Sequence, residues 1–259
     1  MTEPQPLFSI ITVTYNAAST IGPTLSSVAA QTYGGPVEYI VMDGGSTDGT
    51  PDIARRSGIE GITVVSERDR GLYDAMNKGL DRARGQYVIF LNAGDTFHSP
   101  EVLARYAEAI ERHNTPGIVY GQTLLVDSER RPVGPRHLSA PEQLTYRSFA
   151  DGMTVCHQAM AVLKRISSPY DLSYRFSADY EWVLRCLQHS RANVYVGPEP
   201  VIDYLNEGVT TRNEFRSLRE RFRIMCYYYG ILPTLLRHVR FAVRGLSRKL
   251  RTHRKPLSR

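Results

Sequence analysis

Cysteine is scarce in this 259-residue chain, which has only three, Cys156, Cys186 and Cys226, far apart in the sequence. Their spacing matches neither a metal site nor a disulfide framework, both of which need cysteines in recognisable patterns. We therefore predict reduced, mostly buried thiols, as is typical of proteins in a reducing cytoplasm.

Long apolar segments are absent as well. No run of about 18 apolar residues occurs, which leaves no candidate for a membrane-spanning helix. The first residues, MTEPQPLF, contain neither the basic nor the apolar part of a signal peptide. We therefore expect a cytoplasmic protein that neither crosses a membrane nor is secreted by such a signal.

Negative charge is scarce in one region of the chain. Residues 212–259 contain 14 Lys and Arg against 2 Asp and Glu, although the net charge of the whole chain is only +6. The preceding residues are acidic, with 18 Lys and Arg against 24 Asp and Glu. An acidic body would repel a phosphate backbone, so this distribution argues against a nucleic-acid-binding protein.

The basic region is also amphipathic. Apolar residues recur at helical spacing from residue 216 onward, and we expect Pro233 to divide them into two helices. A basic amphipathic helix suits an anionic membrane surface. We therefore predict a catalytic domain over residues 1–211 and, over residues 212–259, C-terminal basic amphipathic helices that bind such a surface.

Apolar runs typical of strands alternate with helical patterns between residues 7 and 200. This alternation implies an α/β fold with a mostly parallel sheet and helices on both faces. No G-x-G-x-x-G follows the first run, which argues against a NAD enzyme of the Rossmann type. The predicted strands cover residues 7–14, 37–42, 61–65, 87–91, 118–126 and 192–196, a further apolar run covers residues 159–163, and residues 128–141 are predicted to be loop.

Two of the predicted strands end in a polar turn that contains an aspartate. Asp43 opens the turn DGGSTDGT, and Asp95 closes the turn NAGD. The carboxyl ends of parallel strands meet at one edge, where open α/β sheets bind their ligands. A carboxylate such as Asp95 can there hold a divalent cation and, through it, a phosphate.

Two predicted helices carry further candidate residues. The first is predicted to turn Leu72, Met76, Leu80 and Ala83 toward the core, with Asp74, Asn77 and Lys78 on its other side. The second begins in SADYEWVLR, where Ser177 can cap it and the helix dipole favours an ionised Asp179. Glu181 is two residues further on and points elsewhere, so only one of the two carboxylates can face the crevice.

Taken together, these segments resemble the inverting family 2 glycosyltransferases with a GT-A fold, in particular bacterial enzymes that build surface polysaccharides and glycolipids. The resemblance covers residues 7–211 and implies the Rossmann-like sheet of the nucleotide-diphospho-sugar transferases. It rests on six segments in the family's order, SIITVTYN, DGGSTDGT, GLYDAMNKG, FLNAGD, CHQA and ADYEWVLR.

The resemblance implies a donor site. Thr14, Tyr15 and Asn16 would line the nucleotide pocket, and Asp43 would bind the edge of the base. The residues expected to approach the ribose, diphosphate or donor sugar are Asp74, Asn77 and Lys78.

The resemblance also implies a metal site and a catalytic base. Asp95 matches the last aspartate of the family's DxD-type motif, which binds Mg²⁺ or Mn²⁺, and Asp179 matches the base. Asn92 stands beside the donor where an aspartate is common in the family, so it contributes no charge to the metal site. One base that faces the anomeric carbon from the side opposite the diphosphate gives inversion.

We therefore expect a metal-dependent, inverting glycosyltransferase, peripheral at the inner face of the cytoplasmic membrane. It would move a sugar from a nucleotide-sugar donor, a UDP-sugar, to a lipid-linked or glycan acceptor in surface polysaccharide or glycolipid biosynthesis. The alternatives are a catalytically weak or inactive nucleotide-sugar-binding relative of the same fold, which Asn92 favours, and a nucleic-acid-binding protein.

Overall fold

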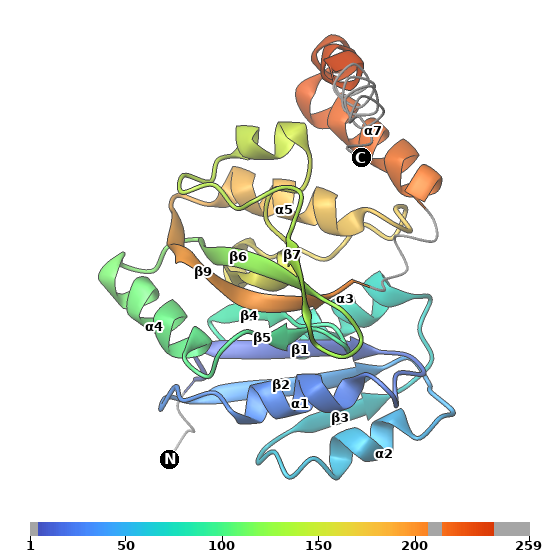
Figure 1. Ribbon diagram of the computed structural model, residues 1–259, viewed down its shortest axis with the longest axis vertical. Coiled ribbons are helices and arrows are strands. Elements are labelled where there is room, and N and C mark those ends of the chain that lie inside the picture. The colour runs from blue at the N-terminus through green and yellow to red at the C-terminus, as the bar shows by residue number, and fades with distance from the viewer. Residues whose placement is uncertain (1–4, 207–213, 241–259) are drawn as a thin grey trace, which may run out of the picture.

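The structure is a computed structural model that describes residues 5–206 and 214–240 (Figure 1). The strands are β1 (Phe8–Thr14), β2 (Val37–Asp43), β3 (Thr63–Ser66), β4 (Tyr87–Phe90), β5 (Thr96–Phe97), β6 (Ile118–Val126), β7 (Pro132–Pro135), β8 (Met160–Leu163) and β9 (Asn193–Leu205). The α-helices are α1 (Ile21–Ala29), α2 (Thr50–Arg55), α3 (Leu72–Arg82), α4 (Val102–Arg112), α5 (Ala178–His189) and α7 (Glu214–Tyr229). Three short 3₁₀ helices are η1 (Tyr146–Asp151), η2 (His157–Ala159) and η3 (Lys164–Ile166).

One continuous sheet joins these strands in the order β3-β2-β1-β4-β8-β6-β9-β5, with β7 paired to β6. The first four strands are mutually parallel, as predicted from the alternating pattern. All seven residues of β1 and all four of β4 are buried, which is why these strands are apolar runs rather than alternating ones. This parallel half places the ends of β1, β2 and β4 at one edge.

The other half of the sheet is mixed, so the prediction of a mostly parallel sheet is wrong there. Strand β8 is antiparallel to both β4 and β6, and β5 is antiparallel to β9, whereas β6 and β9 are parallel. The predicted loop over residues 128–141 contains β7, which forms a hairpin with β6. A short turn, with Arg130 at a φ of +64°, suffices for this connection because hairpins join antiparallel strands.

Helix α3 lies against β1 and β2 with a face that was predicted only in part. Met76 and Leu80 are buried as expected, but Leu72 is 45% exposed and Tyr73 is buried instead. Leu72 opens the helix at the carboxyl edge of the sheet, beyond the core. Gly79 marks the closest approach to β1, because a Cβ atom there would lie 2.5 Å from Ile11 Cγ2.

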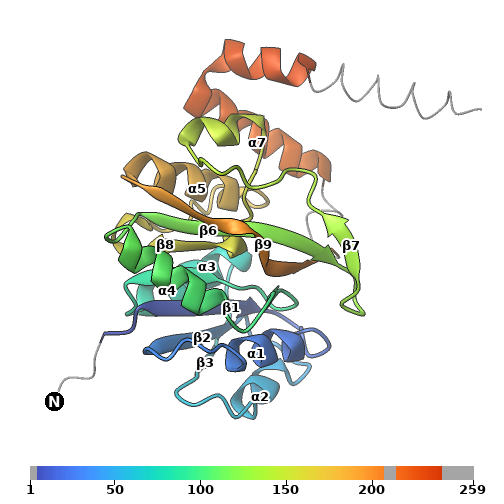
Figure 2. The same ribbon diagram turned by 60° about the vertical axis from the view of Figure 1, so that its left-hand side comes forward.

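Helix α7 and a helix whose described part spans residues 231–240 pack over α5 and η1, at the opposite end of the molecule from α2 (Figure 2). The break between them falls at Gly230, at a φ of +88°, and not at Pro233 as predicted. Pro233 lies in the first turn of the second helix, where its missing N–H costs nothing. The expected basic helices beyond residue 240 lie outside the described residues. Among the residues that the structure describes, no helix is long and apolar enough to cross a membrane.

Candidate functional site

The turns that follow β1 and β2 are tied together at the carboxyl edge. Asn16 adopts a φ of +48°, and its backbone N–H donates to Ser46 Oγ at 2.8 Å. Its side-chain Oδ1 accepts from Thr47 N–H at 3.0 Å. Asp48 binds Ala18 N–H at 2.9 Å in the same way. The predicted nucleotide residue Asn16 therefore shapes the crevice through its backbone and side chain together.

Asp43 is buried beneath this junction as the centre of its own turn. Its Oδ2 accepts from the N–H groups of Gly45 and Ser46 and from Ser66 Oγ, at 3.1, 2.9 and 2.6 Å. Its Oδ1 accepts only from Ser46 Oγ among the described residues, so one lone pair remains there. The predicted contact with a base edge stays a prediction that this lone pair permits.

Tyr15 and Thr14 lie beside Asp43 and differ in exposure. The Tyr15 ring is 67% exposed and borders Gly44, where an added Cβ would meet both this ring and the carboxylate of Asp69. Thr14 is buried, and its hydroxyl finds no hydrogen-bond partner in the described chain. An exposed ring and an unpartnered hydroxyl at one edge suit a planar, polar ligand such as a nucleobase.

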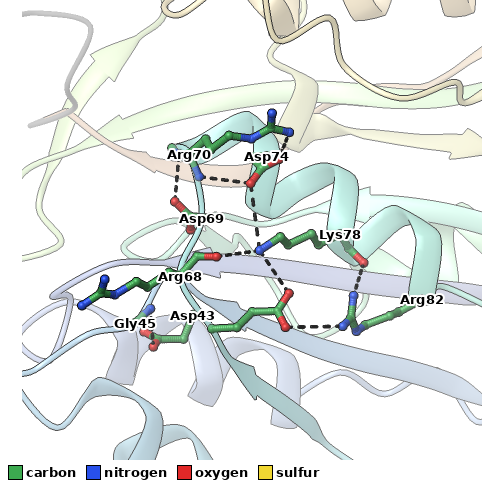
Figure 3. Close-up of polar contacts among 10 residues, drawn as sticks. Asp43, Gly45, Arg68, Asp69, Arg70, Asp74, Lys78 and Arg82 are labelled. Atoms are coloured by element: carbon green, nitrogen blue, oxygen red, sulfur yellow. Dashed lines mark hydrogen bonds and ion pairs between the residues drawn. The ribbon is translucent and has the colours of Figure 1, made fainter.

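The start of α3 carries a network of charged side chains (Figure 3). Asp74 accepts from the backbone N–H of Arg70 at 3.0 Å and from its guanidinium at 2.9 Å, and these bonds lower its pKa although burial opposes them. Lys78 Nζ donates to Arg68 O at 2.7 Å and pairs with Glu67 at 3.1 Å. These contacts hold the segment that leads into α3 close to the β2 turn.

Asn77 is turned away from this network. Its amide donates to Tyr170 O at 3.0 Å and accepts from Tyr170 N–H at 2.7 Å, which joins α3 to the segment before α5. The donor contacts predicted for Asp74, Asn77 and Lys78 stay predictions.

Asp95 lies at the end of the β4 turn and is 4% exposed. Its Oδ2 accepts from Gln158 Nε2 at 2.9 Å, and its Oδ1 accepts from Leu205 N–H at 3.0 Å. Burial raises the pKa of Asp95 to about 6, although these bonds and the charge of Arg130 oppose the rise. A carboxylate in this condition gains from a nearby cation, which would restore its ionised form.

The β4 turn also offers a second oxygen, because Asn92 Oδ1 is buried and receives no hydrogen bond from any described residue. Within residues 5–206 and 214–240, no three His, Cys, Asp or Glu side chains come together as a metal site. Mg²⁺ and similar ions need fewer protein ligands when phosphate oxygens complete the shell. Asp95 and Asn92 therefore supply oxygen atoms of the kind that a divalent ion binds.

Asp179 lies in the first turn of α5, as predicted. Tyr73 Oη donates to its Oδ1 at 3.1 Å, and His157 Nδ1 lies 3.6 Å from its Oδ2. Burial would raise the pKa of Asp179, but His157, the charge of Arg221 and the N–H of Tyr180 outweigh it, so the pKa lies below the usual value. This carboxylate is ionised at neutral pH.

Glu181 points elsewhere, as its spacing from Asp179 predicted. It accepts from Arg185 Nε at 2.8 Å and from Tyr228 Oη at 2.5 Å, which ties α5 to α7. Glu181 is therefore a structural residue of this interface.

The segment just before α5 is held from another helix. Ser177 makes no side-chain cap, contrary to the prediction. Glu220 of α7 accepts instead from the N–H groups of Arg175, Phe176 and Ser177, at 3.0, 2.8 and 3.0 Å. These three N–H groups precede the helix, so Glu220 fixes the segment that leads into α5 and not the unpaired N–H groups of its first turn.

Adjacent residues of η2 connect the two predicted carboxylates, since Gln158 bonds to Asp95 and His157 lies against Asp179. Sequence reasoning singled out the CHQA segment but assigned neither contact. It also missed Arg130, which donates to Gly94 O at 2.6 Å and to Thr96 Oγ1. Gln158 and Arg130 are far in sequence from the residues that they bind. No local sequence pattern therefore predicts these contacts.

A hollow of about 430 Å³ lies away from these residues. It is lined by Leu7, which precedes β1, and by Tyr33, Ala107 and Ile110. Leu7 marks the amino edge of the sheet, so this hollow lies across the sheet from Asp43, Asp95 and Asp179, and it contains none of the predicted site residues.

Comparison with known proteins gives three findings. Residues 9–168 match the family model described as Glycosyl transferase family 2. The chain is 34% identical over 219 residues to the PGL/p-HBAD biosynthesis glycosyltransferase of Mycobacterium tuberculosis, covering 82% of this chain and 79% of that protein. Solved structures share the GT-A-like α/β fold with its curled mixed sheet.

Two of these structures contain ligands. S. aureus TarS in complex with UDP-GlcNAc has a TM-score of 0.70 at 19% identity, over 85% of this chain and 65% of that one. Mannosyltransferase PcManGT from Pyrobaculum calidifontis in complex with GDP-Man and Mn²⁺ has a TM-score of 0.61 at 18% identity, over 93% and 76%. At these identities the likeness concerns the fold.

Proposed function

Because this chain belongs to glycosyl transferase family 2, we propose that it transfers a sugar, with inversion and metal dependence, from UDP to an acceptor hydroxyl. The observation that carries the proposal is the link through η2, in which Gln158 binds Asp95 at 2.9 Å and His157 lies 3.6 Å from Asp179. A carboxylate suited to a cation and an ionised carboxylate therefore adjoin the same short element. Displacement at an anomeric carbon needs both groups at one site.

Asp179 acts as the general base in this reaction. It takes the proton of the acceptor hydroxyl as that oxygen attacks the anomeric carbon, and the bond from this carbon to the diphosphate breaks. The diphosphate leaves with the electron pair, and a bound Mg²⁺ or Mn²⁺ would supply positive charge to stabilise it. Tyr73 holds the base in position through its hydrogen bond to Oδ1.

Asp95 and Asn92 would hold the ion, while Asp43, Thr14 and Tyr15 would hold the base of the nucleotide. The lone pair that remains on Asp43 Oδ1 can accept one N–H, and a uracil presents one such N–H at its edge. The titles of the solved neighbours support a nucleoside diphosphate donor, since they name UDP-GlcNAc in one case and GDP-Man in the other.

The acceptor is a lipid-linked or glycan hydroxyl in surface polysaccharide or glycolipid biosynthesis. The name of the mycobacterial relative, a PGL/p-HBAD biosynthesis glycosyltransferase, supports this class of product. Residues 1–211 would form the catalytic domain and residues 212–259 the membrane-binding region.

Membrane binding is supported by an apolar face that the second C-terminal helix turns outward. Leu232 and Leu236 are 68% and 63% exposed, while Thr234 faces inward and is buried. The exposed apolar residues of this helix share one side, Ile231, Leu232, Leu235, Leu236 and Val239. The sequence that follows, residues 241–259, contains seven Lys and Arg without any Asp or Glu. Anionic lipid at the inner face of the cytoplasmic membrane fits both features.

Calorimetric titration of UDP, GDP and NAD, each with and without Mn²⁺, tests the proposed donor. We expect UDP to bind more tightly when Mn²⁺ is present, because the ion would link the diphosphate to Asp95. Binding of NAD with no response to either diphosphate would reject the proposal. Diphosphate binding without any release of UDP from a UDP-sugar would identify an inactive relative of the fold.

Sedimentation with anionic liposomes tests the membrane surface. The double variant Leu232→Ser and Leu236→Ser should weaken liposome binding by about tenfold or more, because each leucine buries an apolar side chain in the interface. Val133→Ser, at an exposed position of β7, is the matched control and should bind as the unaltered protein does. Equal sedimentation of all three proteins would show that this face does not contact lipid.

A further inference from the structure

Arg221 lies on the inward face of α7, an unusual place for an arginine. Ser217, one turn earlier on the same face, is buried. Its Oγ lies 3.0 Å from the Oγ of Ser177, which is two residues before Asp179 in the chain. Ile224 and Met225 continue the face and are also buried. Arg221 therefore projects toward the start of α5, where the candidate base lies, and not toward solvent like its neighbour Arg219.

The position of Arg221 is held firmly. Its neighbour Glu220 accepts three backbone hydrogen bonds from residues 175–177, and Ser217 contacts Ser177 through both its hydroxyl and its carbonyl. Tyr228, two turns further along the same face, binds Glu181 of α5. Contacts before, beside and after Arg221 thus fix this stretch of α7 against α5.

One nitrogen of the Arg221 guanidinium nevertheless lacks a partner in the described chain. Arg221 Nε is buried, and no residue of the described chain accepts a hydrogen bond from it. A buried N–H without an acceptor is costly, and a charged one more so. The charge of Arg221 also contributes, after His157, to the lowered pKa of Asp179. The Nε of an arginine held beside a base can therefore donate to a ligand that supplies an acceptor.

A second side chain next to Asp179 is in the same condition. His157 is 5% exposed, and neither ring nitrogen makes a hydrogen bond to any residue that the structure describes. The ring lies against Phe90 and faces Asp179 at 3.6 Å. Nδ1 is thus paired with the Asp179 carboxylate, while Nε2 is a buried polar atom without a partner in the described chain, which is unusual for a buried imidazole.

We propose that Arg221 and His157 form an acceptor subsite beside Asp179 that binds an anionic group of the acceptor, a phosphate or a carboxylate. The inference rests on the proposed function and deepens it, because it names the chemical class of the acceptor. Guanidinium groups bind both anions through paired N–H donors. An anionic acceptor would be repelled by the ionised Asp179, and Arg221 supplies the positive charge that offsets this repulsion.

Two sources share this chemistry, the phosphate of a lipid-linked sugar and the carboxylate of an acidic glycan. Helix α7 leads through Gly230 directly into the outward apolar face at Leu232 and Leu236. Tyr229, the last residue of α7, lies eight positions beyond Arg221, or about 12 Å along the helix, and Leu232 follows it by three positions. The phosphate of a lipid in a membrane that contacts Leu232 and Leu236 is close enough to reach Arg221. A separate probe for each source tells the two apart.

Binding of two small probes tests the subsite without knowledge of the natural acceptor. Hexyl phosphate represents a lipid phosphate and glucuronic acid an acidic glycan, and each is titrated in solution into the full chain already saturated with UDP and Mn²⁺. We expect at least one probe to bind and Arg221→Gln to weaken its binding by about tenfold or more. Arg221→Lys keeps the charge but loses the paired donors. Its affinity for the probe should lie between those of the unaltered protein and Arg221→Gln.

Arg219→Gln is the matched control, since Arg219 is on the same helix and exposed. It should bind the probes as the unaltered protein does. Tighter binding of hexyl phosphate would assign the subsite to a lipid phosphate, and tighter binding of glucuronic acid to an acidic glycan. Equal affinities in Arg221→Gln and the unaltered protein, or no binding of either probe, would overturn the inference. Titration of UDP into the same samples separates this failure from a failure of the proposed function.

Discussion

The two halves of the sheet differ in how their polar groups are used. In the parallel half, Asp43 receives four hydrogen bonds from its own turn and from Ser66. Beside the mixed half, His157 and Arg221 are held in position, yet the described residues leave His157 Nε2 and Arg221 Nε buried without an acceptor. The first arrangement builds a rigid cradle from one local motif. The second collects side chains from distant segments around Asp179 and keeps them available for a ligand.

The largest expected effect separates the halves by function. Asp179→Asn should lower sugar transfer by about two to four decades, because the amide cannot take the acceptor's proton. UDP binding should stay unchanged, since Asp179 belongs to the mixed half. Steady-state kinetics together with titration of UDP measure both, and Asp171→Asn, in an exposed loop, is the control. Unchanged turnover would show that another residue is the base.

Asp95 lies between the halves and should show a conflict between stability and function. Its native pKa of about 6 exceeds the ordinary value of 3.8 because of burial, so the native state holds a proton that the unfolded state releases between these pH values. Its contribution to stability therefore falls by about 3 kcal/mol as the pH rises from about 4 to above 6. Asp95→Asn should remove this loss and raise the melting temperature at pH 8.

The same variant should lose the Mn²⁺ dependence of UDP binding, because the amide brings no charge to the ion. Calorimetry and thermal melts at pH 4 and pH 8 measure the two effects. A lower melting temperature at pH 8, with the Mn²⁺ response intact, would contradict both the raised pKa of Asp95 and the assignment of Asp95 to the metal.

Asp43 should show the opposite balance, since its carboxylate is satisfied by the protein. Asp43→Asn should lower the free energy of unfolding by about 2 kcal/mol, because one of its oxygens no longer accepts. Chemical denaturation measures this loss, with Asp52→Asn in an exposed pair on α2 as the control. A gain in stability like that expected for Asp95→Asn would remove the difference between these two aspartates.

The smallest expected effect concerns the contact between α7 and the segment before α5. Glu220→Gln should lower the free energy of unfolding by about 1 kcal/mol, because an amide nitrogen replaces one of the oxygens that accept these backbone N–H groups. Turnover should fall more than UDP affinity, because the first turn of α5 carries Asp179. Glu108→Gln, in an exposed ion pair with Arg112, is the control and should change neither. Equal losses in turnover and UDP affinity would indicate a general loss of structure.

The parallel half could be predicted because its information is local. Strands β1, β2 and β4 are apolar runs closed by polar turns, and such a pattern specifies both the element and the edge on which Asp43 and Asp95 lie. Family resemblance added the roles of these residues. The structure brings the turns of Asn16 and Asp43 together as expected, while it gives Asn77 to the Tyr170 backbone.

The mixed half depends on contacts between distant segments, and here the sequence was less informative. Glu220 holds the segment before a helix whose first residues are more than forty positions earlier, and Ser177 occupies the cap position without capping. A serine before a helix is a reasonable signal, but here its hydroxyl bonds to Ser217 of α7 instead. The predicted burial of Leu72 is wrong for a related reason. Helical spacing does not reveal where a helix extends beyond the sheet that it covers.

The most direct test of the account is a crystal structure with UDP and Mn²⁺ bound. We predict an anomalous manganese signal at the Asp95 carboxylate. The uracil of UDP should lie between Tyr15 and Asp43, and its diphosphate should face η2. Nucleotide bound in the hollow beside Leu7 and Tyr33, or manganese without contact to Asp95, would contradict it.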